Sequence, residues 1–263
     1  MPKAQDKRKS DILNKVIRAA RKTLTKAQAV KIEPFIRHFY ETVPHHDLDG
    51  REPTELFQRA NQIWRFGGKR TAQKALVRVF NPTLSEHGYE SDHTVVEIVN
   101  EDMPFLVDSV ASEFGWQGLE THLLIHPVIK VRRTKTGKMA ELIELGMADS
   151  GSHKESTMHL EITHQSGARL VEIKARLELI LSDVRAAVED WRPMRERMAQ
   201  IIEDMHVSPK GYHIDEVSET REFLRWIHDN NFTFLGFREY MPKGKGRSAS
   251  MELAPATGLG MMR

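Results

Sequence analysis

Histidines in two predicted strands are the side chains whose types could most readily hold a metal ion. His122 and His126 lie four residues apart, on the same face of one extended strand. At about 3.3 Å per residue they are separated by about 13 Å, which is too far for both to bind one ion. His159, in a neighbouring predicted strand, could complete a pair with either of them. Because histidines on polar strand faces are far commoner than metal ligands, we predict no metal site.

Three further patterns could support catalysis or cofactor binding, and each is incomplete. Asp108 and Ser109 suggest a catalytic triad, but no G-x-S-x-G nucleophile elbow accompanies them. Residues 67–71 resemble a phosphate loop, yet they lack its upstream glycine and follow a predicted helix rather than a strand. The chain also has no G-x-G-x-x-G dinucleotide fingerprint. We therefore predict that this chain contains no catalytic residue and binds no cofactor.

One stretch, from Asn100 to Val110, joins an apolar run to a short amphipathic pattern. Asp102 can accept hydrogen bonds from the free amides of a first helical turn, and Pro104 lacks an amide that would need a partner there. The stretch therefore predicts a corner between a strand and a helix that starts beside Pro104. Exposed amides at a helix start suit a carboxylate ligand. The candidate ligand-binding residues of this corner are Asn100, Glu101, Asp102, Met103 and Phe105.

The helix after this corner should lie across a sheet. Apolar residues at helical spacing predict its inward face, and Gly118 is placed to end it. A long apolar stripe predicts another helix over residues 168–191, which Pro193 kinks or ends, and a second segment over residues 194–205. The inward residues of the first helix are Phe105, Leu106, Val110 and Phe114.

The sheet itself is predicted from short apolar or alternating stretches. Residues 93–100 are too apolar for a surface strand, so we place them centrally. Residues 121–133 form a long strand with an edge or a bulge near Pro127, which has no amide for a ladder. Residues 156–162 alternate cleanly, with the even-numbered side chains facing the core. The predicted strands span residues 75–80, 93–100, 121–133, 139–145 and 156–162.

Further elements are predicted before and after the sheet. A helix from Pro53 is closed by Gly67, and the last predicted strand, residues 232–240, has no obvious partner in the sequence. Residues 208–211 mark a break between helices. The other predicted helices span residues 10–24, 33–43 and 216–229.

The composition is that of a globular protein, and it excludes several classes of function. Of the 263 residues, 40% are hydrophobic and 29% charged, which is enough to build a core. No apolar run is long enough to span a bilayer, and no signal-like segment is present, so we expect a cytoplasmic protein with no membrane partner. Without cysteine the chain can form no disulfide and no thiolate site. The net charge of +2 does not favour nucleic acid as the main partner.

The positive charge is concentrated at the start of the chain. The first 26 residues contain nine lysines and arginines against two acidic residues. Apolar residues recur there at helical spacing, which predicts an amphipathic helix docked on its own chain or on a partner subunit. A basic arm that binds nucleic acid or an anionic membrane remains the alternative.

The order strand, corner, helix, strand, strand, helix resembles the ACT domain, a βαββαβ module that senses small molecules. Three separated motifs, residues 99–110, 155–159 and 232–240, are more specifically similar to the N-terminal region of the large bacterial NAD-dependent glutamate dehydrogenases. The likeness runs from about residue 35 to the end of the chain. It implies an α+β fold: a ferredoxin-like antiparallel sheet with helices on one face, preceded by an N-terminal helical segment.

The resemblance also implies a function. The parent enzyme of this family oxidatively deaminates glutamate to 2-oxoglutarate with NAD in a downstream catalytic domain, and this chain would be its non-catalytic, regulatory or assembly segment. ACT domains that bind amino acids often carry glycine where this chain has Phe105, so the ring could fill or cap the ligand space. No fourth strand follows residues 168–191, so residues 75–80 or a partner chain would complete the sheet.

Three functions are therefore open. The corner could sense an amino-acid effector, the module could act only in oligomer assembly, or the basic N-terminus could bind RNA. The expected partners are the rest of the parent polypeptide and further copies of it. The expected domains are a basic helix (1–30), a helical lead-in (31–74), the ACT-like domain (75–206) and the truncated start of another domain (214–263).

Overall fold

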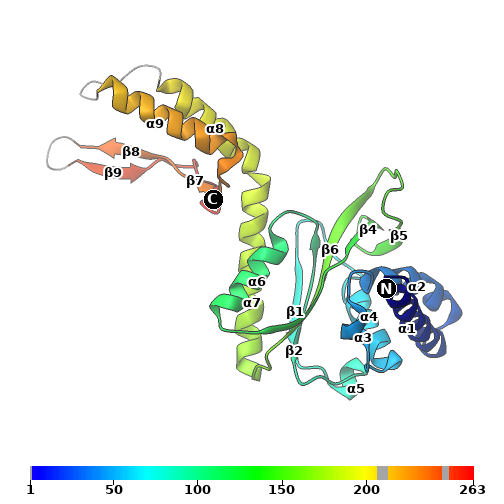
Figure 1. Ribbon diagram of the computed structural model, residues 1–263. Helices are drawn as coiled ribbons and strands as arrows, with labels where there is room; N and C mark the ends of the chain where they lie inside the picture. Colours follow the sequence, from blue (N-terminus) through cyan, green and yellow to red (C-terminus); the bar gives the residue numbers. More distant parts are fainter. Residues whose placement is uncertain (1, 206–212, 245–248) are drawn as a thin grey trace. The chain divides into compact units, whose positions relative to one another are not determined.

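The computed structural model describes residues 2–205, 213–244 and 249–263, with side chains from residue 7 onward (Figure 1). The chain divides into two compact units: Met1–Met103 with Val107–Leu179, and Pro104–Leu106 with Ile180–Arg263. The break predicted at residues 208–211 lies outside the described residues. Within the described ranges, no helix is both long enough and apolar enough to cross a membrane.

A six-stranded antiparallel sheet forms the centre of the first unit. Its strands follow the order β1-β2-β6-β4-β5, and β3 also pairs with β6. The central position predicted for residues 93–100 is confirmed, because β2 lies between β1 and β6. The strands are β1 (Leu76–Phe80), β2 (Thr94–Glu101), β3 (Thr121–Ile125), β4 (Val128–Arg133), β5 (Met139–Ile143) and β6 (Ser152–Ile162).

Strand β1 completes the sheet at the edge beside β2. The two strands are antiparallel, with Leu76 opposite Val99 and Phe80 opposite Val95. The sequence shows no fourth strand after residues 168–191. Strand β1, which precedes the corner in the chain, completes the sheet instead. The fold is α+β and ACT-like, as the sequence predicts.

Residues 121–133 form two strands rather than the single predicted strand. Both pair with β6: β3 lies opposite its end, where Ile125 faces His159, and β4 lies opposite its beginning. Pro127 lies between β3 and β4, and its carbonyl accepts a hydrogen bond from the Thr157 amide at 3.0 Å. The irregularity expected at Pro127 is confirmed, and it divides the strand because proline cannot donate to the ladder.

Helices cover both faces of the sheet (Figure 1). Helix α6 (Leu106–Trp116) and the first part of α7 (Gly167–Glu189) lie over one face, and Arg176 of α7 bonds Glu113 of α6 at 3.0 Å. The N-terminal helices lie over the other face, where they share a core with Val99, Ile129 and Val131 of the sheet. These helices are α1 (Pro2–Thr23), α2 (Lys26–Phe39), α3 (His45–Leu48) and α4 (Pro53–Phe66), and a short α5 (Leu84–His87) follows β1.

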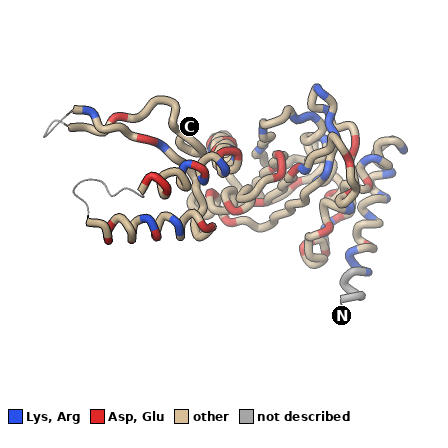
Figure 2. Tube along the Cα trace, turned by 90° about the horizontal axis from the view of Figure 1, so that it is seen from above, with Lys and Arg blue, Asp and Glu red and all other residues tan. Residues whose placement is uncertain are grey.

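The apolar side of α1 is docked on its own chain, with Val16 and Ile17 buried. Lysines and arginines recur along this helix (Figure 2). Helix α2 starts at Lys26, well before the predicted residue 33. A capping box at Thr25 fixes this start, because its hydroxyl accepts from the Gln28 amide while the Gln28 side chain accepts from the Thr25 amide.

The second unit contains helices and two small sheets. Helix α7 ends at Glu189 and α8 (Trp191–Asp204) begins beyond it; α9 (Ile214–Trp226) is followed by a π-helical turn, Ile227–Asn231. Residues 232–240 do not form the single predicted strand. They contribute to two pairs, β7 (Gly236–Phe237) with β10 (Leu259–Gly260), and β8 (Tyr240–Lys243) with β9 (Ser250–Leu253).

Candidate functional site

The corner between β2 and α6 departs from the predicted geometry at its centre. Helix α6 begins at Leu106, so the prediction that it starts beside Pro104 with Asp102 as its cap is wrong. Phe105 has a φ of 69°, a left-handed conformation that cannot continue into a right-handed helix and therefore delays its start. The Asp102 amide instead donates to the Lys154 carbonyl at 3.0 Å and extends the β2–β6 pairing.

Phe105 is the most unusual residue of the corner. A bulky side chain at positive φ is a genuine outlier, of the kind that concentrates at ligand sites and switches. Its side chain is also 47% exposed, so the prediction that it faces the core is wrong. Leu106, Val110 and Phe114 are buried as predicted, and Gly118 ends the helix with a φ of 67°. The ring of Phe105 is therefore attached to a strained backbone and is not part of the hydrophobic core.

Buried polar groups lie behind this corner. Asn100 is buried and stands opposite Ser156, which is also buried. The Ser156 hydroxyl is 2.5 Å from Nε2 of His126. Burial lowers the pKa of His126, although the nearby charge of Asp102 acts to raise it. Asn100, Ser156 and His126 thus provide an amide, a hydroxyl and a neutral imidazole next to the carboxylate of Asp102.

The five predicted site residues do not all lie on the same side of the sheet. Because side chains alternate along a strand, Asn100 and Glu101 point to opposite faces of the sheet. Glu101 stands opposite Glu155, on the face covered by the N-terminal helices. Met103 is partly buried. Asn100 and Asp102 remain on the side where a ligand could meet the start of α6.

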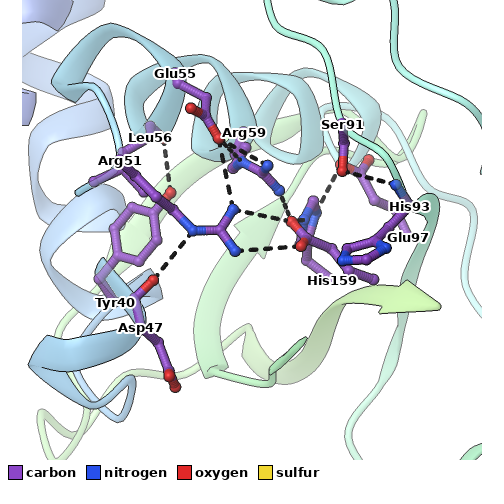
Figure 3. A network of polar contacts seen from close by, with 11 residues as sticks. Tyr40, Asp47, Arg51, Glu55, Leu56, Arg59, Ser91, His93, Glu97 and His159 are labelled. Carbon is purple, nitrogen blue, oxygen red and sulfur yellow. Dashed lines mark hydrogen bonds and ion pairs between the residues drawn. The ribbon is translucent and has the colours of Figure 1, made fainter. Parts of the chain in front are cut away.

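A second polar assembly fills the face of β2 and β6 under the N-terminal helices (Figure 3). Glu97, His159 and Glu161 are all buried there. Arg51 reaches both carboxylate oxygens of Glu161 at 3.3 Å, and Arg59, itself buried, also pairs with Glu161. These contacts tie the loop before α4, and α4 itself, to the centre of the sheet.

The same assembly continues toward β1. Arg78 donates to Glu97 at 2.7 Å, and Nδ1 of His159 lies 3.2 Å from the other oxygen of Glu97. Burial lowers the pKa of His159, although its hydrogen bond to Glu97 acts to raise it. The guanidinium of Arg59 lies 4.7 Å from the ring centre of Tyr89, and burial raises the pKa of Tyr89. The arginines of this assembly therefore each pair with a buried carboxylate.

Glu155 is the centre of a third buried cluster. Arg70 and Arg133 each approach it to 2.7 Å, and Nε2 of His153 lies 2.9 Å away. Burial acts to raise the pKa of Glu155, but the hydrogen bond and charge of Arg133 and the charge of Arg70 hold it below its ordinary value. Arg70 is positioned by Gly137, where an added Cβ would lie 2.4 Å from the Arg70 carbonyl oxygen.

These clusters explain several residues that suggested chemistry in the sequence. Arg70, from the stretch resembling a phosphate loop, is paired with Glu155. His122 stacks on His93 with ring centres 4.1 Å apart, His126 bonds Ser156, and His159 bonds Glu97. Among the residues that the structure describes, no group of three or more potential ligands is arranged to hold a metal ion.

The buried ion pairs leave little sign in the sequence. The alternation in β6 correctly places Met158, Leu160 and Ile162 in the core. The same alternation suggests that the odd-numbered residues face solvent, and Glu155, Thr157, His159 and Glu161 are instead buried.

The antiparallel sheet, its β2–α6 corner and the helices α6 and α7 define an ACT-like domain. The chain belongs to the family of the glutamate dehydrogenase ACT1 domain, which matches residues 35–177. This finding confirms the family resemblance that residues 99–110 and 155–159 suggest.

Whole relatives are much longer than this chain. An NAD-specific glutamate dehydrogenase of Halomonas elongata is 34% identical over 239 residues, which is 90% of this chain and 15% of the relative. That of Pseudomonas aeruginosa is 32% identical over 232 residues, 87% of this chain and 14% of the relative. That of Mycobacterium tuberculosis is 24% identical over 202 residues, 74% of this chain and 12% of the relative.

Proposed function

We propose that this chain is a non-catalytic regulatory segment of an NAD-dependent glutamate dehydrogenase, and that the corner from Asn100 to Phe105 senses an amino acid. The parent protein would oxidatively deaminate L-glutamate to 2-oxoglutarate in the cytoplasm, with NAD bound by a downstream catalytic domain. The names of the relatives support the parent activity. The observation that carries the sensing role is the left-handed φ of 69° at Phe105.

The chemistry of the corner suits a free amino acid. The amides at the start of α6 would meet the carboxylate of the ligand, because a helix N-terminus favours negative charge. Asp102 would accept the ammonium group, and Asn100 would hydrogen-bond the polar part of the ligand. Met103 and Phe105 would contact its side chain, while Glu101, which points to the other face, would act through the backbone.

Calorimetry tests this role. The chain is titrated with each of the twenty proteinogenic amino acids, and at least one should give saturable heat. Asp102→Ala should weaken that binding about tenfold or more, because a hydrogen bond to a charged group contributes about 1.5–3 kcal/mol. The matched control is Glu120→Ala, which removes an exposed carboxylate beyond the end of α6 and should leave the affinity unchanged. No heat with any amino acid would contradict the proposal.

Assembly is a second candidate function, and the surface of the second unit favours it. Large apolar side chains are exposed there, as expected of a surface that other parts of a protein cover. The rest of the parent polypeptide, or a second copy of it, would supply that cover. The exposed side chains include Ile214, Phe223, Trp226, Phe232 and Leu235.

Light scattering tests the assembly role. The chain should self-associate, or it should bind the remaining part of the parent when the two are mixed. A strict monomer that also fails to bind the rest of the parent would exclude this role. Phe223→Ser should reduce the association, whereas Lys135→Ser, on an exposed hairpin turn of the other unit, should not.

A further inference from the structure

A pocket of about 300 Å³ lies among the N-terminal helices, where α2 and α4 meet beside the end of α1. Each of the two longer walls is one face of a helix, because its residues recur at spacings of three and four. The lining comprises Leu24, then Gln28, Lys31 and Ile32 of α2, and Asn61, Trp64 and Arg65 of α4. None of these residues belongs to the corner from Asn100 to Phe105, so the pocket is a separate feature of the same unit.

The apolar part of the pocket combines aliphatic side chains with an indole ring. Ile32 is buried, and Leu24 and Trp64 are partly buried and pack against the core of the N-terminal helices. The ring of Trp64 is held in place by the buried ring of Phe35, with ring centres 5.0 Å apart. An aromatic ring fits such a surface, because it gains both apolar burial and a ring contact with the indole.

Two cations line the pocket from opposite helices. Lys31 of α2 and Arg65 of α4 are exposed, and neither forms an ion pair with another described residue. None of the described lining residues is acidic. Lys22 in the last turn of α1 and Lys26 at the start of α2 add further positive charge on either side of Leu24 in the chain. The charge of this region therefore favours an anionic ligand.

The neutral side chains of the lining add a hydrogen-bond donor. Oε1 of Gln28 accepts from the amide and the hydroxyl of Thr25, at 3.1 Å and 3.0 Å. These bonds fix the side chain, and no described residue accepts from its Nε2. The groups available to a ligand thus include an ammonium, a guanidinium and an amide NH₂, all of which donate to a carboxylate.

We propose that this pocket binds a small aromatic carboxylate, with its ring against Trp64 and its carboxylate at Lys31 and Arg65. The volume is at the lower end of the range of about 300–1,000 Å³ found for small-molecule sites, which suits a ligand with a single ring. A zwitterionic amino acid fits less well, because the described lining has no carboxylate to balance its ammonium group. The site therefore goes beyond the sensing proposed for the corner and does not depend on it.

Calorimetry with phenylacetate tests the proposal on the whole 263-residue chain. Phenylacetate should bind at one saturable site. Lys31→Gln and Arg65→Gln change exposed side chains, and each should weaken binding about tenfold because it removes a hydrogen bond to a charged group. Lys15→Gln is the matched control: it removes an exposed lysine of α1 that does not line the pocket, and it should leave the affinity unchanged.

Nuclear magnetic resonance places the ligand in the chain. The protein has four tryptophans, so four indole N–H signals are expected, and the one that is lost in Trp64→Phe belongs to Trp64. Phenylacetate should shift that signal with the same saturation curve as the heat. Saturable binding that leaves the Trp64 signal unmoved would overturn the proposal, because the ligand would then lie elsewhere.

Two further probes separate the contributions of ring and charge. Phenylacetamide, which has the same ring without the charge, should bind at least tenfold more weakly than phenylacetate, and inorganic phosphate, which has charge without a ring, should also bind at least tenfold more weakly. Equal binding of phenylacetamide, or unchanged affinity in both the Lys31→Gln and Arg65→Gln variants, would overturn the proposal in favour of unspecific apolar contact. Equal binding of phosphate would overturn it in favour of simple attraction of anions. No saturable binding of phenylacetate would contradict it outright.

Discussion

The two faces of strands β2 and β6 are built from opposite chemistry. Toward α6 and α7 the strands present Ile98, Met158 and Leu160, an apolar layer of the usual kind. Toward the N-terminal helices they present carboxylates and a histidine that are just as deeply buried. The apolar face forms the core under α6 and α7, and on the polar face the ion pairs of Arg51 and Arg59 with Glu161 lie beside an apolar core that Val99 shares with the N-terminal helices. The buried residues of the polar face include Glu97, Glu155, His159 and Glu161.

The two faces position their neighbouring elements with different precision. Apolar contacts are tolerant of direction, so they would allow helices to dock in several positions. Ion pairs require particular partners, and each carboxylate here meets an arginine from a particular element. Arg59 comes from α4, Arg78 from β1 and Arg133 from β4. Only Arg59 lies in an N-terminal helix, so we infer that its pair with Glu161 fixes the position of α4, while the pairs of Arg78 and Arg133 fix strands of the sheet relative to one another.

The largest effect is expected at the centre of the third cluster. Glu155→Gln leaves Arg70 and Arg133 buried without their counter-charge, and breaking a buried ion pair in this way costs about 3–5 kcal/mol. Urea unfolding should show this loss of free energy. Glu141→Gln is the control, because Glu141 pairs with Arg132 on the surface and such pairs contribute only about 0–1 kcal/mol. Equal costs for both variants would mean that the buried cluster around Glu155 contributes no more to stability than a surface ion pair.

A slightly smaller effect is expected on the apolar face. Leu160→Ala removes a buried side chain from the side of β6 that faces α6 and α7. Large-to-small changes of this kind cost about 2–5 kcal/mol of unfolding free energy. Urea unfolding measures the loss. Because it acts on the domain core, the variant should destabilise the whole first unit in one transition. Retention of wild-type stability would show that this face is not a packed core.

Much of the fold can be predicted because periodicity reports local structure. The strand at residues 93–100 and the helix from Pro53 are recognisable from their own residues. The polar face is not, because Glu161 and its partner Arg59 are separated by about a hundred positions and no local pattern links them. The predicted helix over residues 33–43 is too short at its start, because Pro34 is typical of a first turn although it lies inside α2.

The corner can be predicted in position but not in detail. Its existence follows from an apolar strand, Asp102 and Pro104, all of which are local signals. The left-handed backbone at Phe105 cannot be foreseen, because most phenylalanines avoid positive φ and only the surrounding fold imposes it.

A moderate effect is expected from a matched pair of variants at the corner. Phe105→Ala removes the ring but keeps a Cβ in the left-handed region, whereas Phe105→Gly removes both. The glycine variant should be more stable than the alanine variant by about 1 kcal/mol, the strain that a Cβ causes there. Urea unfolding of the two variants measures the difference. Equal stabilities would mean that the backbone is not strained.

The pH dependence of stability should distinguish the polar face from the apolar one. Burial holds the pKa of His159 below its ordinary value of 6.5, so below that pH the unfolded chain binds a proton that the folded chain resists. Stability should therefore fall as the pH drops through 6.5, by at most about 1.4 kcal/mol per pH unit for this one group.

The control for this prediction is His159→Asn, which cannot titrate. The variant should show a shallower loss of stability between pH 6.5 and about pH 5 than the wild type, measured by urea unfolding at each pH. Other histidines of the unit, such as His126, keep part of the slope because burial lowers their pKa too. An unchanged slope would contradict the assignment of His159 as a buried neutral group.

The sensing role of the corner is tested most directly by amide hydrogen exchange. The chain is compared with and without a mixture of the twenty proteinogenic amino acids. If the corner binds one of them, exchange should slow at residues 100–107, because a bound carboxylate would engage the amides at the start of α6. Exchange at those residues that is the same with and without the mixture would contradict the sensing role.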